Sequence, residues 1–461
     1  MTVKNYSSYN SKPDYLKRNL KKVLCLTFSA LLSSTSVVAN EPILLQAVDL
    51  QYVGAFRVTY VNQAEGRTGF APARIVISSA TNSFFMNGNP YFAIAEYKIP
   101  EILNSENLED LAFTGPPIQS FTNMFGKAPY TTEQNNLEAI GGMELIDNRL
   151  VVSVYDGYDA ASSYGFDVDN VMIINDPFDL KNSTVTGYLQ MSDKMFAAGW
   201  FSSIPLNLRD SLGGDYITGM ARQASINGRW SQGPSAYSLF IDDLLNTENG
   251  GTIPNLKLQK YPLFNRMSSL SSWNYDNTNC PSFVNDNSLW DASCVVGNDL
   301  WTELSMVFYG TIIPGTNTYL TIGRSGGHRK GIAYKNTPID GPGACSGECP
   351  YDWHDWDNYI WFFDVADMIK FKNGLTQEYD AQPYAYGPIK LPFDDINADG
   401  FISLISGADY DPQTNRLYIS LGRADSKQGT ESTPLILVYE INVLPRPSPP
   451  PSINKPVVND K

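Results

Sequence analysis

Two arginines that end matching phrases are the residues of this chain best suited to bind an anionic ligand. The phrase Tyr319–Arg324 (YLTIGR) matches Tyr418–Arg423 (YISLGR) at all six positions by residue class, and Arg222 follows a weaker copy. Equivalent positions of a repeated unit could bring these arginines to one site. Guanidinium groups form forked hydrogen bonds with carboxylate and sulfate groups. The pattern predicts an anionic ligand such as a uronate-containing glycan; the alternative is that each arginine pairs with a neighbouring acid.

The only two histidines, His328 and His354, are candidates for a general base near neutral pH. Elimination from a uronate needs a cation beside its carboxylate and a base that removes the C5 proton. Arg324 and His328 are therefore a candidate catalytic pair. With Cys345 and Cys349, both histidines would also complete a Cys2His2 zinc set. An ordinary surface or core hydrogen bond is the simpler alternative for each histidine.

An aromatic and acidic segment, 351–357, resembles a sugar-binding surface. Trp353, His354 and Trp356 alternate there with aspartates. Aromatic faces stack on sugar C–H groups while carboxylates accept hydroxyl hydrogens, and loops on rigid scaffolds often carry function. The alternative is a small loop core in which the tryptophans pack against one another.

Asp395, Asn397 and Asp399 fit the start of an EF-hand-type calcium loop, D-x-N-x-D-G. The twelfth position is Ser406 instead of glutamate, and no helical pattern flanks the loop. We predict either a structural calcium site completed by another carboxylate or a simple turn.

If the strands form a closed ring, carboxylates on the strands nearest its axis would indicate a glycoside hydrolase, because such enzymes use a pair of carboxyl groups in catalysis. Asp49, Glu138 and Glu303 are candidates for such positions. The G-x-S-x-G and H-E-x-x-H signatures are absent from the sequence, which argues against a serine hydrolase and a zinc protease.

The elements that position these residues follow from a repeat. Strand-like phrases follow polar turns five times along the chain, at Asn82, Asn148, Asp215, Asn317 and Asn415. A supersecondary unit repeated along a chain predicts a closed all-β array, a β-propeller with five blades, with six or seven left open. The segment 50–60 should pair with the last strand and close the ring, which removes exposed edges.

Hairpin chemistry predicts individual strands, with Asp, Asn, Pro and Gly between β-branched and aromatic runs. One interval should contain strands at 139–145, 150–155, 171–174 and 187–191, and the last interval strands at 402–410, 417–421 and 435–439. Helical periodicity is scarce, and residues 366–372 are the one short candidate.

The ends of the chain differ from the middle. Lys17, Arg18, Lys21 and Lys22 precede a short apolar run, and small residues end at Ala39, so residues 1–39 read as a secretory signal peptide. Residues 40–443 would form the propeller domain, and the Pro-rich residues 444–461 an unfolded tail. We therefore expect a secreted or periplasmic, monomeric protein without a membrane span.

Charge and cysteines agree with export. Removal of residues 1–39 takes away six basic residues and one acidic residue, so the net charge goes from −15 to −20. Such a surface repels nucleic acid. The expected partner is an extracellular glycan or another anionic molecule, which would bind at the locally basic arginines. Four cysteines remain, and an even number in an exported chain predicts disulfides that pin loop insertions, most simply Cys280–Cys294 and Cys345–Cys349 among three connectivities.

Three phrases carry a resemblance: 199–205 (GWFSSIP), 231–237 (SQGPSAY) and 407–412 (GADYDP). Together they resemble a functionally uncharacterised family of exported bacterial proteins, over residues 136–441. The resemblance implies a propeller-like fold and export, and it implies no activity.

Overall fold

The computed structural model describes residues 43–90, 92–129, 137–156, 169–220, 234–260, 274–275, 295–296, 300–302, 304–334, 337–395, 400 and 402–443. Within these ranges the chain is mostly β-structure, and the short helices lie between strands. No helix of the described part is long and apolar enough to cross a membrane.

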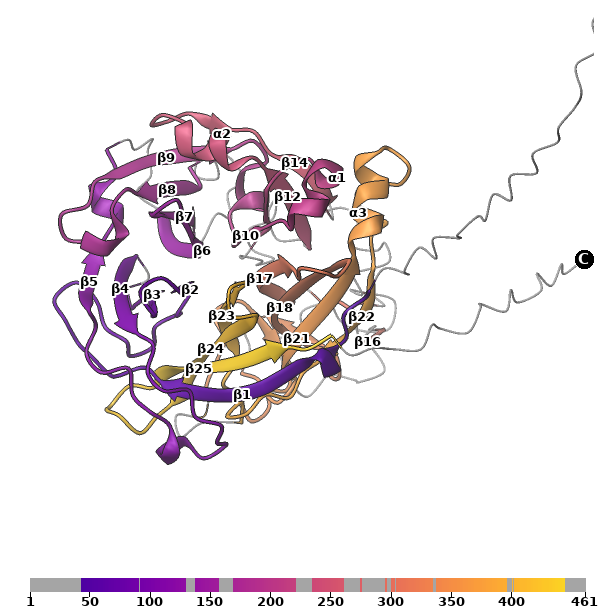
Figure 1. The fold of residues 1–461 in the computed structure, drawn as a ribbon. Coiled ribbons are helices and arrows are strands. Elements are labelled where there is room, and N and C mark those ends of the chain that lie inside the picture. Colours follow the sequence, from indigo (N-terminus) through magenta and orange to yellow (C-terminus); the bar gives the residue numbers. More distant parts are fainter. Residues whose placement is uncertain are drawn as a thin grey trace, which may run out of the picture. The chain divides into compact units, whose positions relative to one another are not determined.

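Five sheets form the blades of a β-propeller (Figure 1), which confirms the predicted fold class and blade number. Strands within a blade pair antiparallel. Blade 1 contains β2 (Ile75–Ser78), β3 (Ser83–Asn87), β4 (Ala93–Lys98) and β5 (Gln119–Asn123), and blade 2 contains β6 (Leu137–Ile146), β7 (Arg149–Asp156), β8 (Val171–Ile174) and β9 (Val185–Met191). Blade 3 contains β10 (Phe201–Ser203), β11 (Tyr216–Thr218), β12 (Ser235–Leu239) and β14 (Leu256–Lys260), blade 4 contains β17 (Met306–Ile312), β18 (Thr318–Gly326), β21 (Trp356–Asp364) and β22 (Pro383–Pro388), and blade 5 contains β23 (Ile405–Asp411), β24 (Arg416–Asp425), β25 (Thr433–Ile441) and β1 (Leu50–Arg57).

Smaller elements decorate this frame. They are β13 (Thr252–Ile253), which pairs parallel with β9, the short pairs β15 (Asn274–Tyr275) with β16 (Val295–Val296) and β19 (Ile332–Tyr334) with β20 (Glu348–Pro350), and the helices α1 (Arg209–Leu212), α2 (Ile241–Asn246) and α3 (Val365–Lys372). The strands and the helix predicted from the sequence coincide with β6 to β9, β23 to β25 and α3 to within a few residues.

The repeated phrase corresponds to the second strand of each blade. β3, β7, β11, β18 and β24 each begin directly after the polar residue that marked a copy of the phrase. Asn82, Asn148 and Asn415 have positive φ angles of 49°, 58° and 56°, a conformation that asparagine adopts more readily than most residues. The repeat is therefore a repeat of hairpin turns.

The first strands of the blades, β2, β6, β10, β17 and β23, contact one another around the axis. Three of them carry a β-bulge, at Gly141, Phe308 and Ser406, where the pairing with the second strand skips a residue. Bulges bend a strand and redirect a side chain, so Phe308 leaves the regular alternation of β17.

Trp200 lies where blades 2, 3 and 4 meet, and three glycines make room for it. A Cβ atom on Gly142 would lie 2.6 Å from Trp200 Cα, one on Gly310 would lie 2.9 Å from Trp200 Nε1, and one on Gly219 would collide with the indole ring. Trp200 is 2% exposed. A side chain at any of these glycines would displace either the tryptophan or a strand.

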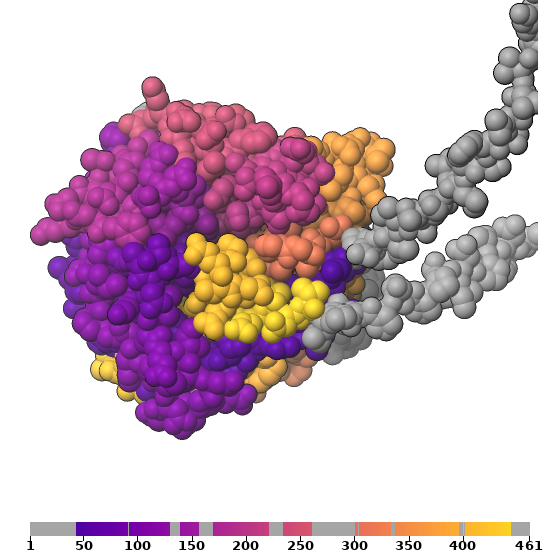
Figure 2. Space-filling model, in the orientation of Figure 1, coloured from indigo at the N-terminus to yellow at the C-terminus, as the bar shows by residue number. Residues whose placement is uncertain are grey.

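The N-terminal strand closes the ring, as predicted. β1 pairs antiparallel with β25 and becomes the outer strand of blade 5, and the indigo and yellow ends of the described chain lie side by side (Figure 2). Arg57 at the end of β1 donates hydrogen bonds of 2.8 and 3.1 Å to Asp425 at the end of β24, and both side chains are buried.

Candidate ligand-binding site

Arg324 belongs to a row of alternating cationic and aromatic side chains. Its guanidinium carbon lies 5.2 Å from the ring centroid of Phe308 and 5.4 Å from that of Trp356. Arg74, which directly precedes β2 of blade 1, lies 4.1 Å over the Phe308 ring. These four residues, here called the cation–aromatic row, connect the start of β2 with the start of β21, and each contact is of the cation–π type.

Trp356 also lines an open pocket of about 650 Å³ in blade 4 and its connection to blade 5. This blade-4 pocket is lined by His354, Trp356, Asp357, Asn358, Pro388, Ile389, Lys390, Asp394, Asp395 and Ile402. Two segments more than twenty residues apart in sequence form it, and they bring His354 and Trp356 of the predicted sugar-binding segment together with Asp395 of the predicted calcium loop.

Asn358 fixes the floor of the pocket. Its side-chain amide accepts a 2.7 Å bond from the backbone N–H of Ile405 and donates to Asp394 Oδ2 and to the carbonyl of Ser403, at 3.4 and 3.2 Å. Lys390 donates to Asp394 and, at 2.8 Å, to Asp395. The polar groups of the pocket are thus held by hydrogen bonds before any ligand arrives.

The turn that carries His354 is held by two cations of the neighbouring loop. Arg329 donates to Asp357 and Lys330 to Asp352, each at 2.6 Å. Burial alone would raise the pKa of Asp352, but the hydrogen bonds from Lys330 and His354 hold it below its ordinary value. Burial raises the pKa of Asp355, whose carboxylate accepts both backbone N–H groups of Arg329 and Lys330.

His328 lies outside the blade-4 pocket. Its Nε2 is 2.6 Å from the Ser325 hydroxyl, and its ring stacks on Tyr359 with centroids 5.0 Å apart. Arg324 does not line the pocket either. The role of Arg324 and His328 as a catalytic pair stays a prediction.

Arg423 and Trp353 occupy other surroundings. Arg423 has a φ of 59° and lies 4.7 Å over the ring of Phe70, so it is Arg74 that shares an aromatic ring with Arg324. Trp353 is partly buried in the loop before β21. Arg222 lies outside the described residues.

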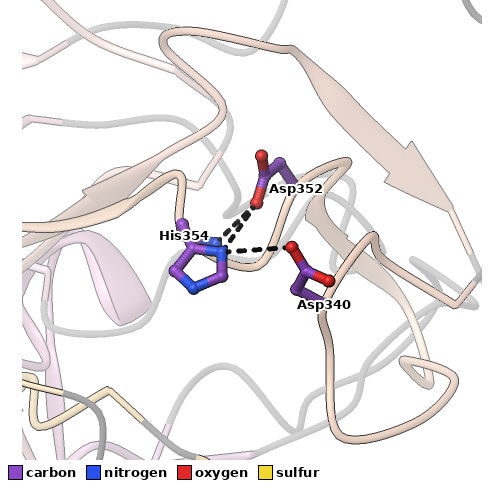
Figure 3. A group of neighbouring side chains, drawn as sticks. All are labelled: Asp340, Asp352 and His354. Carbon is purple, nitrogen blue, oxygen red and sulfur yellow. Dashed lines mark hydrogen bonds and ion pairs between the residues drawn. The ribbon is translucent and has the colours of Figure 1, made fainter.

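Asp340, Asp352 and His354 form a group that could hold a metal ion (Figure 3). His354 Nδ1 lies 3.1 Å from Asp352 Oδ1 and 3.8 Å from Asp340 Oδ2. Asp340 carries no local signal in the sequence, because the turn that holds it approaches His354 only in the folded chain. Of the predicted calcium ligands, Asp395 lies in the blade-4 pocket, and Asn397 and Asp399 lie outside the described residues.

The disulfide Cys345–Cys349 is present, as predicted, and it pins the insertion between β18 and β21. Two sulfurs bonded to each other are not thiolate ligands, so the Cys2His2 zinc set would require the reduced form. Cys280 and Cys294 lie outside the described residues.

Replacing Cys345 and Cys349 together by serine is expected to lower the free energy of unfolding by at most about 2 kcal/mol, because the bond closes only a very short loop. Urea unfolding of the oxidised protein and of the double variant measures the difference. Loss of cooperative unfolding in the variant would contradict a purely local role.

The interpretation of Asp49 as an inner-strand carboxylate was wrong. Asp49 ends a 3-10 turn directly before β1, and β1 is the outermost strand of its blade. Glu138 lies on the inner strand β6, but its side chain is outside the described part, as is the whole of Glu303. The described acids of the inner strands include Glu144 and Asp409, neither of which was predicted from the sequence.

No protein-family profile and no curated protein matches the chain. Solved structures that align with it include a luciferin-regenerating enzyme (TM-score 0.32, 8% identity, 87% of this chain and 95% of that chain), an α-L-arabinofuranosidase from Podospora anserina in complex with cellotriose (0.36, 10%, 86% and 99%) and a glucose dehydrogenase (0.30, 10%, 80% and 96%). The fold assignment rests on the five sheets of this chain, which define a five-bladed β-propeller with a polar, tryptophan-lined pocket on blade 4.

Proposed function

We propose that this protein is an exported β-propeller that recognises an extracellular carbohydrate in the blade-4 pocket. The observation that carries the proposal is the combination of Trp356 with Asp357, Asn358 and Asp394 in one pocket. An indole face offers apolar area with little loss of conformational entropy, and carboxylate and amide oxygens accept hydroxyl hydrogens at fixed positions. This is the chemistry of a sugar ring, which has an apolar face and a polar edge.

The cation–aromatic row extends the proposal to acidic sugars. Arg324 lies against Trp356, so a uronate or sulfate group on a residue next to the stacked sugar would meet its guanidinium. The expected ligand is an oligosaccharide of an extracellular polysaccharide, bound by a monomeric protein. Export itself rests on the signal-like N-terminus and is supported by the disulfide.

Trp356→Ala is expected to weaken carbohydrate binding by about 2 kcal/mol, roughly 30-fold, because the stacking face is lost. Isothermal titration with neutral, uronate-containing and sulfated oligosaccharides measures the change. The matched control is Phe240→Ala, which removes an aromatic ring that is 53% exposed on another blade and should leave affinity unchanged. Equal affinity of Trp356→Ala and wild-type protein for every ligand that binds would exclude the pocket.

The same panel separates the alternatives. Unsaturated or shortened products that disappear in His328→Asn would favour a polysaccharide-degrading enzyme over a binding protein. Absence of binding and cleavage across the panel would leave a structural or protein-binding propeller.

A further inference from the structure

Three side chains of the insertion between β18 and β21 point their ligand atoms at one another (Figure 3). His354 Nδ1 lies 3.1 Å from Asp352 Oδ1 and 3.8 Å from Asp340 Oδ2, and the three atoms lie within 4.8 Å of one another. An ion with tetrahedral bonds of about 2.1 Å would hold its ligand atoms about 3.4 Å apart. The two measured distances fall on either side of this value, so a metal ion fits after small side-chain movements.

Backbone hydrogen bonds hold the turn of Asp340 against the turn of Asp352. The N–H of Ile339 donates to the carbonyl of Tyr351, and the N–H of Trp353 donates to the carbonyl of Ile339, each at 2.9 Å. The disulfide of the insertion closes the chain between the two turns. The two carboxylates are therefore brought together by the backbone, which reduces the cost of ordering them around an ion.

The nearest cations leave these side chains with a net negative charge. Lys330 bonds at 2.6 Å to Oδ2 of Asp352, while Oδ1 of the same carboxylate faces His354. For Asp340, whose side chain is 70% exposed, His354 is the one ion-pair partner among the described residues. With a neutral imidazole, two carboxylates are balanced by one ammonium group, and a bound cation would offset the remaining charge.

We propose that Asp340, Asp352 and His354 bind one divalent transition-metal ion of the zinc class at the rim of the blade-4 pocket. An imidazole nitrogen beside carboxylate oxygens suits zinc, whereas calcium takes about six to eight oxygen ligands. Three protein ligands leave a coordination position open for water or an external ligand. His354 also lines the blade-4 pocket, so the ion lies beside that pocket. The site stands whether or not the pocket binds carbohydrate.

Calorimetric titration of the full, oxidised chain with zinc chloride, after treatment with a chelator, tests the proposal. One ion should bind per chain, and an equal concentration of calcium chloride should not displace it. Asp340→Asn should weaken zinc binding at least about tenfold, since an amide oxygen replaces a carboxylate ligand. Asparagine tolerates the positive φ of 55° at this position, so both proteins should melt at the same temperature in chelator. Absence of zinc binding, or equal affinity of Asp340→Asn and wild-type protein, overturns the proposal.

The two histidines supply a matched comparison. His354→Asn should weaken zinc binding at least about tenfold, whereas His328→Asn should keep the wild-type affinity, because His328 bonds to Ser325 away from the three ligands. Asp395→Asn, which removes a 90% exposed carboxylate of the blade-4 pocket, should also keep it. Loss of zinc binding in His328→Asn would favour the Cys2His2 set, and loss in Asp395→Asn would place the ion inside the pocket; either result overturns the site proposed here.

Discussion

Asp425→Ala is expected to lower the free energy of unfolding by about 3–5 kcal/mol, because it removes the carboxylate that compensates the buried positive charge of Arg57. The Arg57 side chain is 4% and the Asp425 side chain 0% exposed, and among the described residues Glu109, which is exposed and 3.5 Å away, is the one other ionic partner of Arg57. Since the pair joins β1 to β24, the loss falls on the contact that closes the ring. Denaturant unfolding followed by circular dichroism gives the magnitude.

Blade 5 supplies a matched control. Arg416 and Glu440 form an ion pair of 3.1 Å whose side chains are 33% and 37% exposed, and such pairs contribute at most about 1 kcal/mol. Glu440→Ala should therefore cost far less than Asp425→Ala. The double replacement of Arg57 and Asp425 by alanine should lower the free energy of unfolding by less than the sum of the two single replacements, because the double variant contains no uncompensated buried charge at this pair. Equal costs for Asp425→Ala and Glu440→Ala would contradict the role assigned to the buried pair.

Trp200→Ala should cost about 3–5 kcal/mol, the range for truncating a large buried aromatic side chain. Part of the space around the indole is bounded by strand backbone, at the glycines of three blades. Backbone cannot move into the vacated volume as flexible side chains do, so a cavity would remain at the junction of blades 2, 3 and 4.

Thermal unfolding compares Trp200→Ala with Trp353→Ala, which truncates a partly buried tryptophan in the loop before β21. We expect the lower melting temperature for Trp200→Ala. A melting temperature for Trp200→Ala equal to that of Trp353→Ala would show that the three-blade junction relaxes after all.

Local patterns predicted the frame because a propeller is built from local hairpins. The turns at Asn82, Asn148 and Asn415 identify second strands from a few residues each, and Trp356 and His354 were singled out by the aromatic and acidic composition of their own segment. The contacts between blades could not be predicted in this way. Arg74 before β2 of blade 1 contacts Phe308 on β17 of blade 4, and Asp49 was misplaced because nothing local shows that the first strand becomes the outermost one.

The pairing of β1 with β25 has a consequence for how the chain must mature. β1, the first strand of the described chain, finds its partner only when residues 433–441 have been made. Until then the ring is an open arc with a free sheet edge, and a product that ends before β25 keeps it. The two ends of the described chain are also neighbours, with Leu50 opposite Ile441. A short linker between them, with new termini between β5 and β6, would give a chain in which every blade is sequential and β1 is made directly after its partner β25.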